Sequence, residues 1–198
     1  PYTLGIVLGD GGLTNGVCKV TKPDLEFTNE KIPLPDGCRW SKNKKMENRC
    51  QAFSIIGGEY QSSKNPFMVE INRIGLQEKK SDQKFIPNEY LFSSIDNRIA
   101  LLQGLLDTDG YTSGPCIEFS TASERLSNDI VFLVRGLGGT ATQSRERAHY
   151  KKNDERVECL DKYRSMIKLP EWISPFRLDR KADKHKPIQR KHPLKAIV

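Results

Sequence analysis

Two aspartates, each followed by glycine, are the residues of this sequence best suited to chemistry. Asp10 and Asp109 lie 99 positions apart, half of the 198 residues, and each closes an apolar run that contains a glycine. Two carboxylates placed within a few Å repel each other unless a cation binds between them. Mg²⁺ prefers such oxygen ligands, and it can activate water and stabilise the leaving oxygen of an in-line displacement at a phosphodiester. The pair therefore predicts a metal-dependent phosphodiester-cleaving centre.

A single Asp-Gly pair is more often a hairpin turn than a functional site. Two features favour a helix end at Asp10-Gly11 and Asp109-Gly110. The arrangement occurs twice, and an acid at the negative end of a helix dipole is unfavourable unless something such as a cation compensates it. We expect the glycine after each helix to adopt the usual left-handed cap.

The elements that must position the acids are two apolar helices, predicted at residues 2–9 and 100–108. Residues 2–9 carry no charge, so a helix there must be buried on most sides. Gly5 aligns with Gly104 in the repeat. Small residues at a helix contact permit a close crossing. We therefore expect the two helices to pack along these glycines and to bring the acids together.

The repeat continues without a gap beyond the acids. Cys18 aligns with Ile117, Val20 with Phe119 and Thr21 with Ser120. Alternating polarity predicts strands at residues 13–22, 49–57, 140–150 and 163–168, whereas residues 29–48 read as a mobile loop. Further helices are predicted at 65–75, at 88–99, running into 100–108, and from Ser123 onward, with a helix and a basic extension in the last 25 residues. Each half thus reads helix, strands, helix, strands, helix.

Charge is distributed unevenly along the chain. The net charge of +7 arises after residue 150, where 14 basic residues face 7 acidic ones, while residues 1–110 carry 14 of each. This distribution suits a polyanionic partner such as nucleic acid, although a basic tail that serves only solubility is an equally good interpretation.

Cysteine usage and hydropathy point to an intracellular, reducing location. The five cysteines form no C-x-x-C pair, so we expect buried, reduced thiols rather than zinc ligands or disulfides. The three histidines have no metal-ligand spacing and are expected at the surface. No apolar run reaches the roughly 18 residues of a membrane span, and no signal peptide is recognisable. Pro1 is an unusual start, which suggests a piece of a longer chain.

The paired helix-to-acid motifs resemble those of the LAGLIDADG (DOD-type) homing endonucleases, in particular the monomeric kind with two motifs. Residues 84–110 and 117–121 resemble the endonuclease domain found inside inteins. The resemblance implies an α+β fold with two pseudo-symmetric αββαββα halves, residues 1–98 and residues 99–198 with the basic tail. Their antiparallel sheets would form a saddle over the DNA major groove.

The resemblance also implies roles for individual residues. Asp10 and Asp109 would be the catalytic, metal-binding acids, the carbonyls of Gly9 and Thr108 further metal ligands, and Lys84 the catalytic lysine. The expected cofactor is Mg²⁺, with Ca²⁺ or Mn²⁺ as substitutes. The first motif departs from the ideal pattern because it has Leu8 where the second has Asp107. Candidates for the lysine of the second half are Lys181, Lys184 and Lys186.

The partner implied by the resemblance is double-stranded DNA with a long asymmetric target, bound by a monomer without membrane association in the cytoplasm or nucleoid. The expected DNA-binding residues are Lys19, Thr21, Glu118, Ser120, Arg145, Arg147, Arg164, Lys168, Lys181 and Lys184. Glu118 could read a cytosine amino group or pair with a basic neighbour, and we favour the pairing.

Fusion to an intein splicing domain is one arrangement that the resemblance allows. Pro1 and Ile197-Val198 do not supply the terminal residues of splicing, so we expect no splicing by this chain alone. Two alternatives to cleavage stay open. One is a sequence-specific DNA-binding protein of the same fold that does not cut, and the other is an RNA-splicing maturase.

Overall fold

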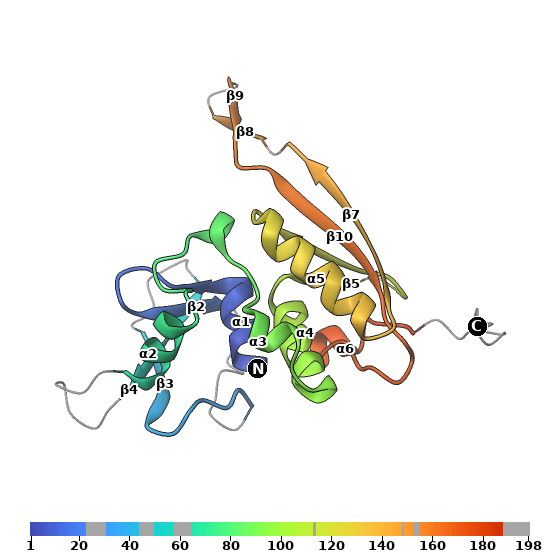
Figure 1. Cartoon of the computed structure of the whole chain (residues 1–198). Coiled ribbons are helices and arrows are strands. Elements are labelled where there is room, and N and C mark those ends of the chain that lie inside the picture. The colour runs from blue at the N-terminus through green and yellow to red at the C-terminus, as the bar shows by residue number, and fades with distance from the viewer. Residues whose placement is uncertain are drawn as a thin grey trace.

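Two helices at the centre of the molecule separate two antiparallel sheets (Figure 1). The computed structural model describes residues 1–22, 31–43, 50–57, 65–112, 114–147, 149–152 and 155–187. The central helices are α1 (Tyr2–Asp10) and α4 (Ile95–Asp109). Every residue from Tyr2 to Leu8 is buried, as the absence of charge in this segment predicts. The two apolar helices therefore form the shared core on which both halves are built.

The first half carries a four-stranded sheet with the order β1-β2-β4-β3. Its strands are β1 (Gly11–Gly12), β2 (Cys18–Lys22), β3 (Cys38–Lys42) and β4 (Gln51–Gly57). Helix α2 (Pro66–Arg73) follows, then the 3₁₀ turn η1 (Ser81–Gln83) and the short helix α3 (Asn88–Leu91). Asn65 caps α2, because its side chain accepts from the backbone N–H of Phe67 at 3.0 Å.

The second half carries a sheet with the order β5-β6-β10-β7. Its strands are β5 (Gly110–Thr112), β6 (Ile117–Thr121), β7 (Thr140–Glu146) and β10 (Lys162–Lys168). Helix α5 (Glu124–Gly136) covers one face of this sheet, and the small helix α6 (Asp179–Ala182) follows strand β10 in the chain. Between β7 and β10, a separate hairpin of β8 (His149–Lys152) and β9 (Glu155–Glu158) projects away from the body (Figure 1).

The strand register confirms the repeat of 99 residues. Gly11 pairs with Val20 in the first sheet, and Gly110 pairs with Phe119 in the second. Val20 and Phe119 are both fully buried. Equivalent positions of the two halves therefore have the same place in their sheets.

The structure corrects several predicted boundaries. The segment 88–99 does not run straight into the central helix, because Ser94 caps a new helix with its side chain and leaves a break after Leu91. Residues 38–42, predicted to lie in a loop, form strand β3 against β4. The predicted strand 140–150 ends at Glu146, and the chain then enters the separate hairpin.

The order αββαββα holds in the second half once the added hairpin is set aside. In the first half, the described residues contain no helix between β2 and β3, and residues 23–30 in that interval are not described. Of the predicted C-terminal helix, only α6 lies within the described residues, and the basic extension beyond residue 187 falls outside them.

The cysteines are all free thiols, as predicted, but their burial differs from the expectation. Cys18 is buried in β2, whereas Cys50 and Cys159 are exposed. In the part of the chain that the structure describes, no helix combines the length and apolarity needed to cross a membrane.

Candidate active site

Both acids stand at the last position of a central helix, as predicted, but the glycines after them are not left-handed caps. Gly11 has φ −75° and ψ 131°, and Gly110 has φ −75° and ψ 138°, so each residue begins a strand directly. Glycine is needed there for space. A Cβ on Gly11 would lie 2.4 Å from the Val7 carbonyl oxygen, and one on Gly110 would lie 2.4 Å from that of Leu106. The Asp-Gly pairs are therefore helix-to-strand junctions and not hairpin turns.

The two central helices cross in backbone contact at Gly5 and Gly104. A Cβ on Gly5 would lie 2.2 Å from the carbonyl oxygen of Leu101, and one on Gly104 would lie 2.1 Å from that of Tyr2. Side chains at either position would force the helices apart. The predicted role of these glycines in a close crossing is thus confirmed.

The same contact continues to the helix ends that carry the acids. A Cβ on Gly9 would lie 1.9 Å from Thr108 Oγ1 and 3.2 Å from Asp109 Oδ2. The carboxylate of Asp109 therefore lies against the backbone next to Asp10. Both acids also act on one ammonium group, since the charges of Asp109 and Asp10 each raise the pKa of Lys84. The acids thus share one junction.

The donors at this junction fit a hard divalent cation. In proteins, Mg²⁺ is usually held by one or two carboxylates, with water and substrate phosphate completing its shell. Among the described residues, no three His, Cys, Asp or Glu side chains form a ready-made metal cage. The carboxylates of Asp10 and Asp109 could thus hold a cation whose other ligands are water, phosphate or backbone carbonyls. The assignment of Gly9 and Thr108 as ligands stays a prediction.

Lys84 lies at the end of α1. Its Nζ is within 3.1 Å of the carbonyl oxygens of Val7, Leu8 and Gly9 and 2.7 Å from that of Gly11. These carbonyls belong to the negative end of the helix dipole, so the ammonium compensates the electrostatics that an acid there makes unfavourable. Burial lowers the pKa of Lys84, and the charges of Asp109, Cys18 and Asp10 oppose that shift.

Lys181 occupies the corresponding position at the end of α4. Its Nζ donates to the carbonyl oxygens of Leu106 at 2.8 Å, Thr108 at 3.0 Å and Gly110 at 2.6 Å. Lys184 and Lys186, the other two candidates, are exposed beyond α6. Each central helix therefore ends in an aspartate and is capped by a lysine from a distant part of the chain.

Two further carboxylates, Asp107 and Asp129, hold the segments that carry these lysines, and neither was predicted to have this role. Asp107 is fully buried and accepts hydrogen bonds from the Tyr2 hydroxyl at 2.8 Å and from the backbone N–H groups of Arg177 and Leu178. Burial raises the pKa of Asp107, and these hydrogen bonds oppose the shift. Asp129 accepts from the backbone N–H of Ile86 at 2.8 Å.

A signal for Asp107 was present in the sequence, because this carboxylate directly follows Leu106 at the position where the first motif has the apolar Leu8. Nothing in the local pattern marks Asp129, which lies 43 positions from its partner Ile86.

The first sheet turns basic and polar residues away from the core. Cys18 and Val20 are buried, so Lys19 and Thr21 of β2 share the opposite, exposed face. Lys19 pairs with Ser54 of β4, and Ser54 pairs with Ser41 of β3, so the three share this side of the sheet, on which Ser54 itself is buried.

The outer face of the second sheet contains an ion-pair network. The side chains of Glu118 and Ser120 in β6 lie on the face of the sheet opposite to that of the buried Ile117 and Phe119. Arg164 of β10 lies 3.0 Å from Glu118 and 3.1 Å from Glu146, and Lys162 lies 3.9 Å from Glu118. The predicted pairing of Glu118 with a basic neighbour is confirmed. Lys168 is exposed at the end of the same strand.

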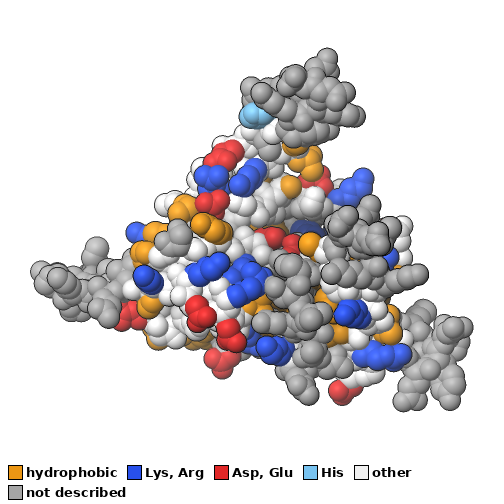
Figure 2. All heavy atoms as spheres, turned by 180° about the vertical axis from the view of Figure 1, so that it is seen from behind, with side chains coloured by type: hydrophobic (Ala, Val, Ile, Leu, Met, Phe, Trp, Pro, Cys, Tyr) orange, Lys and Arg blue, Asp and Glu red, His pale blue; other side chains and the backbone are white. Residues whose placement is uncertain are grey.

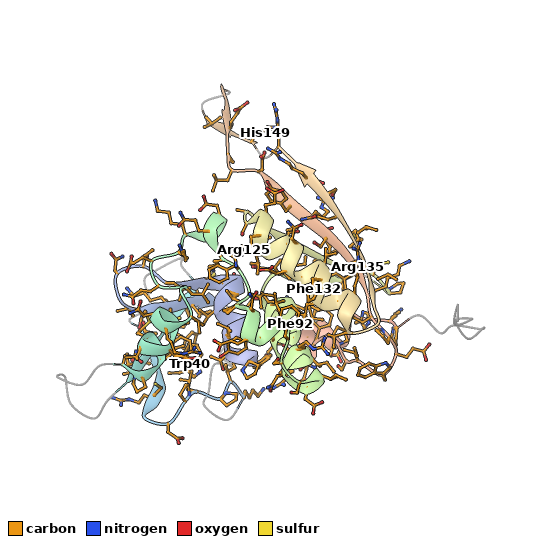
Figure 3. The ribbon with its side chains drawn as sticks, in the orientation of Figure 1. Trp40, Phe92, Arg125, Phe132, Arg135 and His149 are labelled. Carbon is orange, nitrogen blue, oxygen red and sulfur yellow. The ribbon has the colours of Figure 1, made fainter. Side chains whose placement is uncertain are left out.

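Arg145 does not share that face. It pairs with Tyr163, whose side chain is buried, and it forms an ion pair with Asp161. Arg145 and the exposed Arg147 instead contribute to a polar cavity of about 640 Å³ at the base of the β8–β9 hairpin. Its lining residues are Arg145, Arg147, His149, Glu158, Cys159, Leu160 and Asp161. Figure 3 places His149 at this outlying end of the molecule, away from the central helices.

The surface seen from behind carries both signs of charge. Figure 2 shows groups of Lys and Arg side chains near the middle of this face, with acidic side chains beside them.

Comparison with known proteins gives a match to one family model, two curated relatives and several solved structures. Residues 96–167 match the model of the LAGLIDADG-like domain. The chain is 29% identical over 183 residues to a replicative DNA helicase DnaB of Mycobacterium intracellulare. That match spans 92% of this chain and 25% of the relative. This chain is also 26% identical over 171 residues to the replicative DNA helicase DnaB of Synechocystis sp., and that match spans 19% of the relative. The chain thus spans about a quarter or less of the curated relatives that it matches.

Several solved structures share the fold. Mesophilic variants of the homing endonuclease I-DmoI match with a TM-score of 0.50 and 11% identity, over 85% of this chain and 87% of that one. I-DmoI in complex with DNA and Ca matches with a TM-score of 0.50 and 12% identity, over 85% and 81%. A variant bound to its nicked target DNA in the presence of Mn matches with a TM-score of 0.51 and 11% identity, over 84% and 86%. Residues 96–167 thus match the LAGLIDADG-like domain, and the chain as a whole shares the fold of the homing endonuclease I-DmoI.

Proposed function

We propose that this chain is a site-specific, Mg²⁺-dependent double-strand DNA endonuclease. The observation that carries the proposal is the pair of helix ends, each with an aspartate at its last position and a lysine on its terminal carbonyls. A DNA-binding protein that does not cut has no need for two carboxylates at one junction. The complexes of I-DmoI with DNA and with Ca or Mn support the same chemistry in a protein of this fold.

In this proposal, the chain supplies two charged halves of one site. Asp10 and Asp109 provide the oxygen donors, and a bound Mg²⁺ would supply Lewis-acid activation of water and of the scissile phosphodiester. Lys84 and Lys181 place positive charge beside the helix ends, where negative charge develops during displacement. Burial around Lys84 strengthens this electrostatic stabilisation, because charges interact more strongly where water is excluded.

The outer faces of the two sheets would bind the duplex on either side of the acids. The first sheet offers Lys19 and Thr21, and the second offers Ser120, Arg164 and Lys168. Since the two faces differ in sequence, the target would be asymmetric, and a single chain would contact both of its halves. Lys and Arg contacts to phosphates release counterions, so affinity should fall steeply as salt increases.

Selection from a randomised duplex pool tests the proposal directly. Sequences cut in the presence of Mg²⁺ are ligated to an adaptor, amplified and read. Asp10→Asn and Asp109→Asn should lower the cleavage rate by on the order of 10²–10³-fold or more while binding is largely retained. Asp96→Asn, at the exposed opposite end of α4, is the matched control and should cut normally.

Each other outcome has a distinct meaning. Binding of one duplex sequence without metal-dependent cutting would identify a non-cleaving DNA-binding protein. Preference for structured RNA over duplex DNA would identify an RNA-splicing role. Full activity in both acid variants would refute the roles given to these acids.

We further propose that the chain is the endonuclease domain of an intein. The match to 25% of the length of a protein named as a replicative helicase supports a nuclease inserted in a longer host. The test is expression of the full gene that encodes this chain, followed by mass spectrometry of the products. A ligated host protein together with an excised segment containing residues 1–198 is expected, and a single unprocessed chain would contradict the intein assignment.

A further inference from the structure

We propose that Asp107 and Asp129 are positioning residues, each holding in place the lysine that serves one DNA strand. The inference rests on the proposed endonuclease function and adds a division of labour within it. Asp107 would hold the segment that carries Lys181, and Asp129 would hold the segment that carries Lys84.

Asp107 fixes the start of the helix that carries Lys181. Its carboxylate accepts from the backbone N–H of Arg177 at 3.0 Å and from that of Leu178 at 3.3 Å. Leu178 is the N-cap of α6, and its carbonyl oxygen accepts from the backbone N–H of Lys181 at 2.9 Å. A buried carboxylate of α4 thus holds the turn from which Lys181 reaches back to the end of the same helix.

The Lys84 segment is held by a different helix. Three consecutive residues each contact α5 or its cap: the carbonyl oxygen of Lys84 accepts from Ser123 Oγ at 2.6 Å, and the backbone N–H of Ile86 donates to Asp129. Between them, the guanidinium of Arg125, which is labelled in Figure 3, lies 4.0 Å from the centroid of the Phe85 ring. Asp129 therefore anchors the segment two residues beyond Lys84.

The two anchors are structurally independent. Asp107 links α4 to Tyr2 of α1 and to the segment that leads into α6, whereas Asp129 acts from α5 on the link between the two halves. The first motif has the apolar Leu8 where the second has Asp107, so the anchor of one lysine is not duplicated for the other. Each of the two adjoining helix ends has its own aspartate and its own lysine, so each lysine would serve the scissile phosphate of one strand. Loss of one anchor should therefore impair cleavage of one strand.

Strand-resolved cleavage tests this assignment. A duplex recovered from the randomised pool carries a different fluorophore at each 5′ end, and single-turnover rates are measured for both strands with saturating Mg²⁺. Lys84→Ala and Lys181→Ala define which strand each lysine serves. Asp129→Asn should then slow the Lys84 strand, and Asp107→Asn the Lys181 strand, by on the order of 10- to 100-fold relative to the other strand, with nicked DNA accumulating.

The ratio of the two rates separates positioning from general damage. Partial unfolding lowers the amount of active protein but leaves the ratio unchanged. Tyr2→Phe is the matched control, because it removes a hydrogen bond to the same Asp107 carboxylate while sparing those to Arg177 and Leu178. It should keep the wild-type ratio.

A second variant covers the case in which Asp107→Asn does not fold. Gln103 holds the same segment from the more exposed side of α4, since its amide donates to the Ser174 carbonyl at 2.8 Å and accepts from Arg177 Nε at 2.7 Å. Gln103→Ala should therefore bias cleavage in the same direction as Lys181→Ala.

The possible failures are distinguishable. Absence of cleavage by the unmodified chain would refute the endonuclease function and this inference with it. A different outcome is that the unmodified chain cuts, but the two aspartate variants slow both strands equally, slow neither strand or slow the wrong strand. That outcome would overturn only the positioning roles.

Discussion

Replacing Gly104 by alanine is expected to destabilise the protein although it improves the local helix. Alanine in a helix interior is favoured over glycine by up to about 1 kcal/mol. At Gly104, however, the added methyl would lie 2.1 Å from the carbonyl oxygen of Tyr2 and 2.8 Å from the amide nitrogen of Ile6. These are backbone atoms of a buried helix and cannot rotate away. The two central helices must separate instead.

The net cost follows from these opposing terms. Overpacking of a buried contact typically costs about 1–3 kcal/mol and sometimes more. Because both clashing groups are backbone, we expect the upper end of that range and a net loss of about 2 kcal/mol after the helix gain. For a chain of this size, such a loss lowers the melting temperature by roughly 4–8 °C. A shift of about 1 Å at the helix ends should also slow cleavage by on the order of 10²-fold.

Gly136→Ala is the matched control, because Gly136 is also helical, as the last residue of α5. The nearest atom to its added methyl is Arg98 Nη1 at 3.1 Å, the far end of a flexible side chain. This variant should be neutral or slightly stabilised and should cut normally. Thermal unfolding and cleavage are measured for both variants. A Gly104→Ala protein as stable and active as Gly136→Ala would refute the close crossing as the basis of the site.

Two further predictions follow from burial and charge. Burial raises the pKa of Cys18 to about 12, so at pH 8 its thiol stays protonated, and iodoacetamide should label the exposed Cys50 and Cys159 while sparing Cys18. Peptide mass spectrometry reads the labelling, and equal modification of all three would contradict the buried strand. Glu118→Gln should release Arg164 from one carboxylate and strengthen binding to non-target duplex by up to about fivefold. Unchanged affinity in a titration at low salt would mean that this ion pair does not face DNA.

The sequence was sufficient to predict the architecture around the acids. The period of 99 residues, with glycine and aspartate recurring at equal positions, predicted two packed helices with adjacent acids, and the strand registers at Gly11 and Gly110 follow the same period. Capping residues located helix starts well, as Asn65 and Ser123 show. The conformation of the glycines after the acids was predicted wrongly, because glycine can serve either a left-handed turn or a close contact, and only the packing decides between them.

The lysines and their anchors lay partly beyond sequence reasoning. The family resemblance narrowed the lysine of the second half to three candidates, Lys181, Lys184 and Lys186. Choosing among them required knowing which ammonium reaches the end of α4. Asp129 and Ser123 act on a segment about 40 residues away. Such contacts depend on how α5 packs, and no local periodicity encodes them.

The contacts of α5 with residues 84–86 mean that the two halves are not interchangeable modules. A fragment ending at residue 98 would contain Lys84 but would lack Ser123 and Asp129, which fix its backbone. Grafting this half onto an unrelated second half would transfer the acid and the lysine but not the helix that orients them. Chimeras intended to combine the target preferences of two such proteins should therefore exchange strands of the sheets, and keep α5 with the first half that it supports.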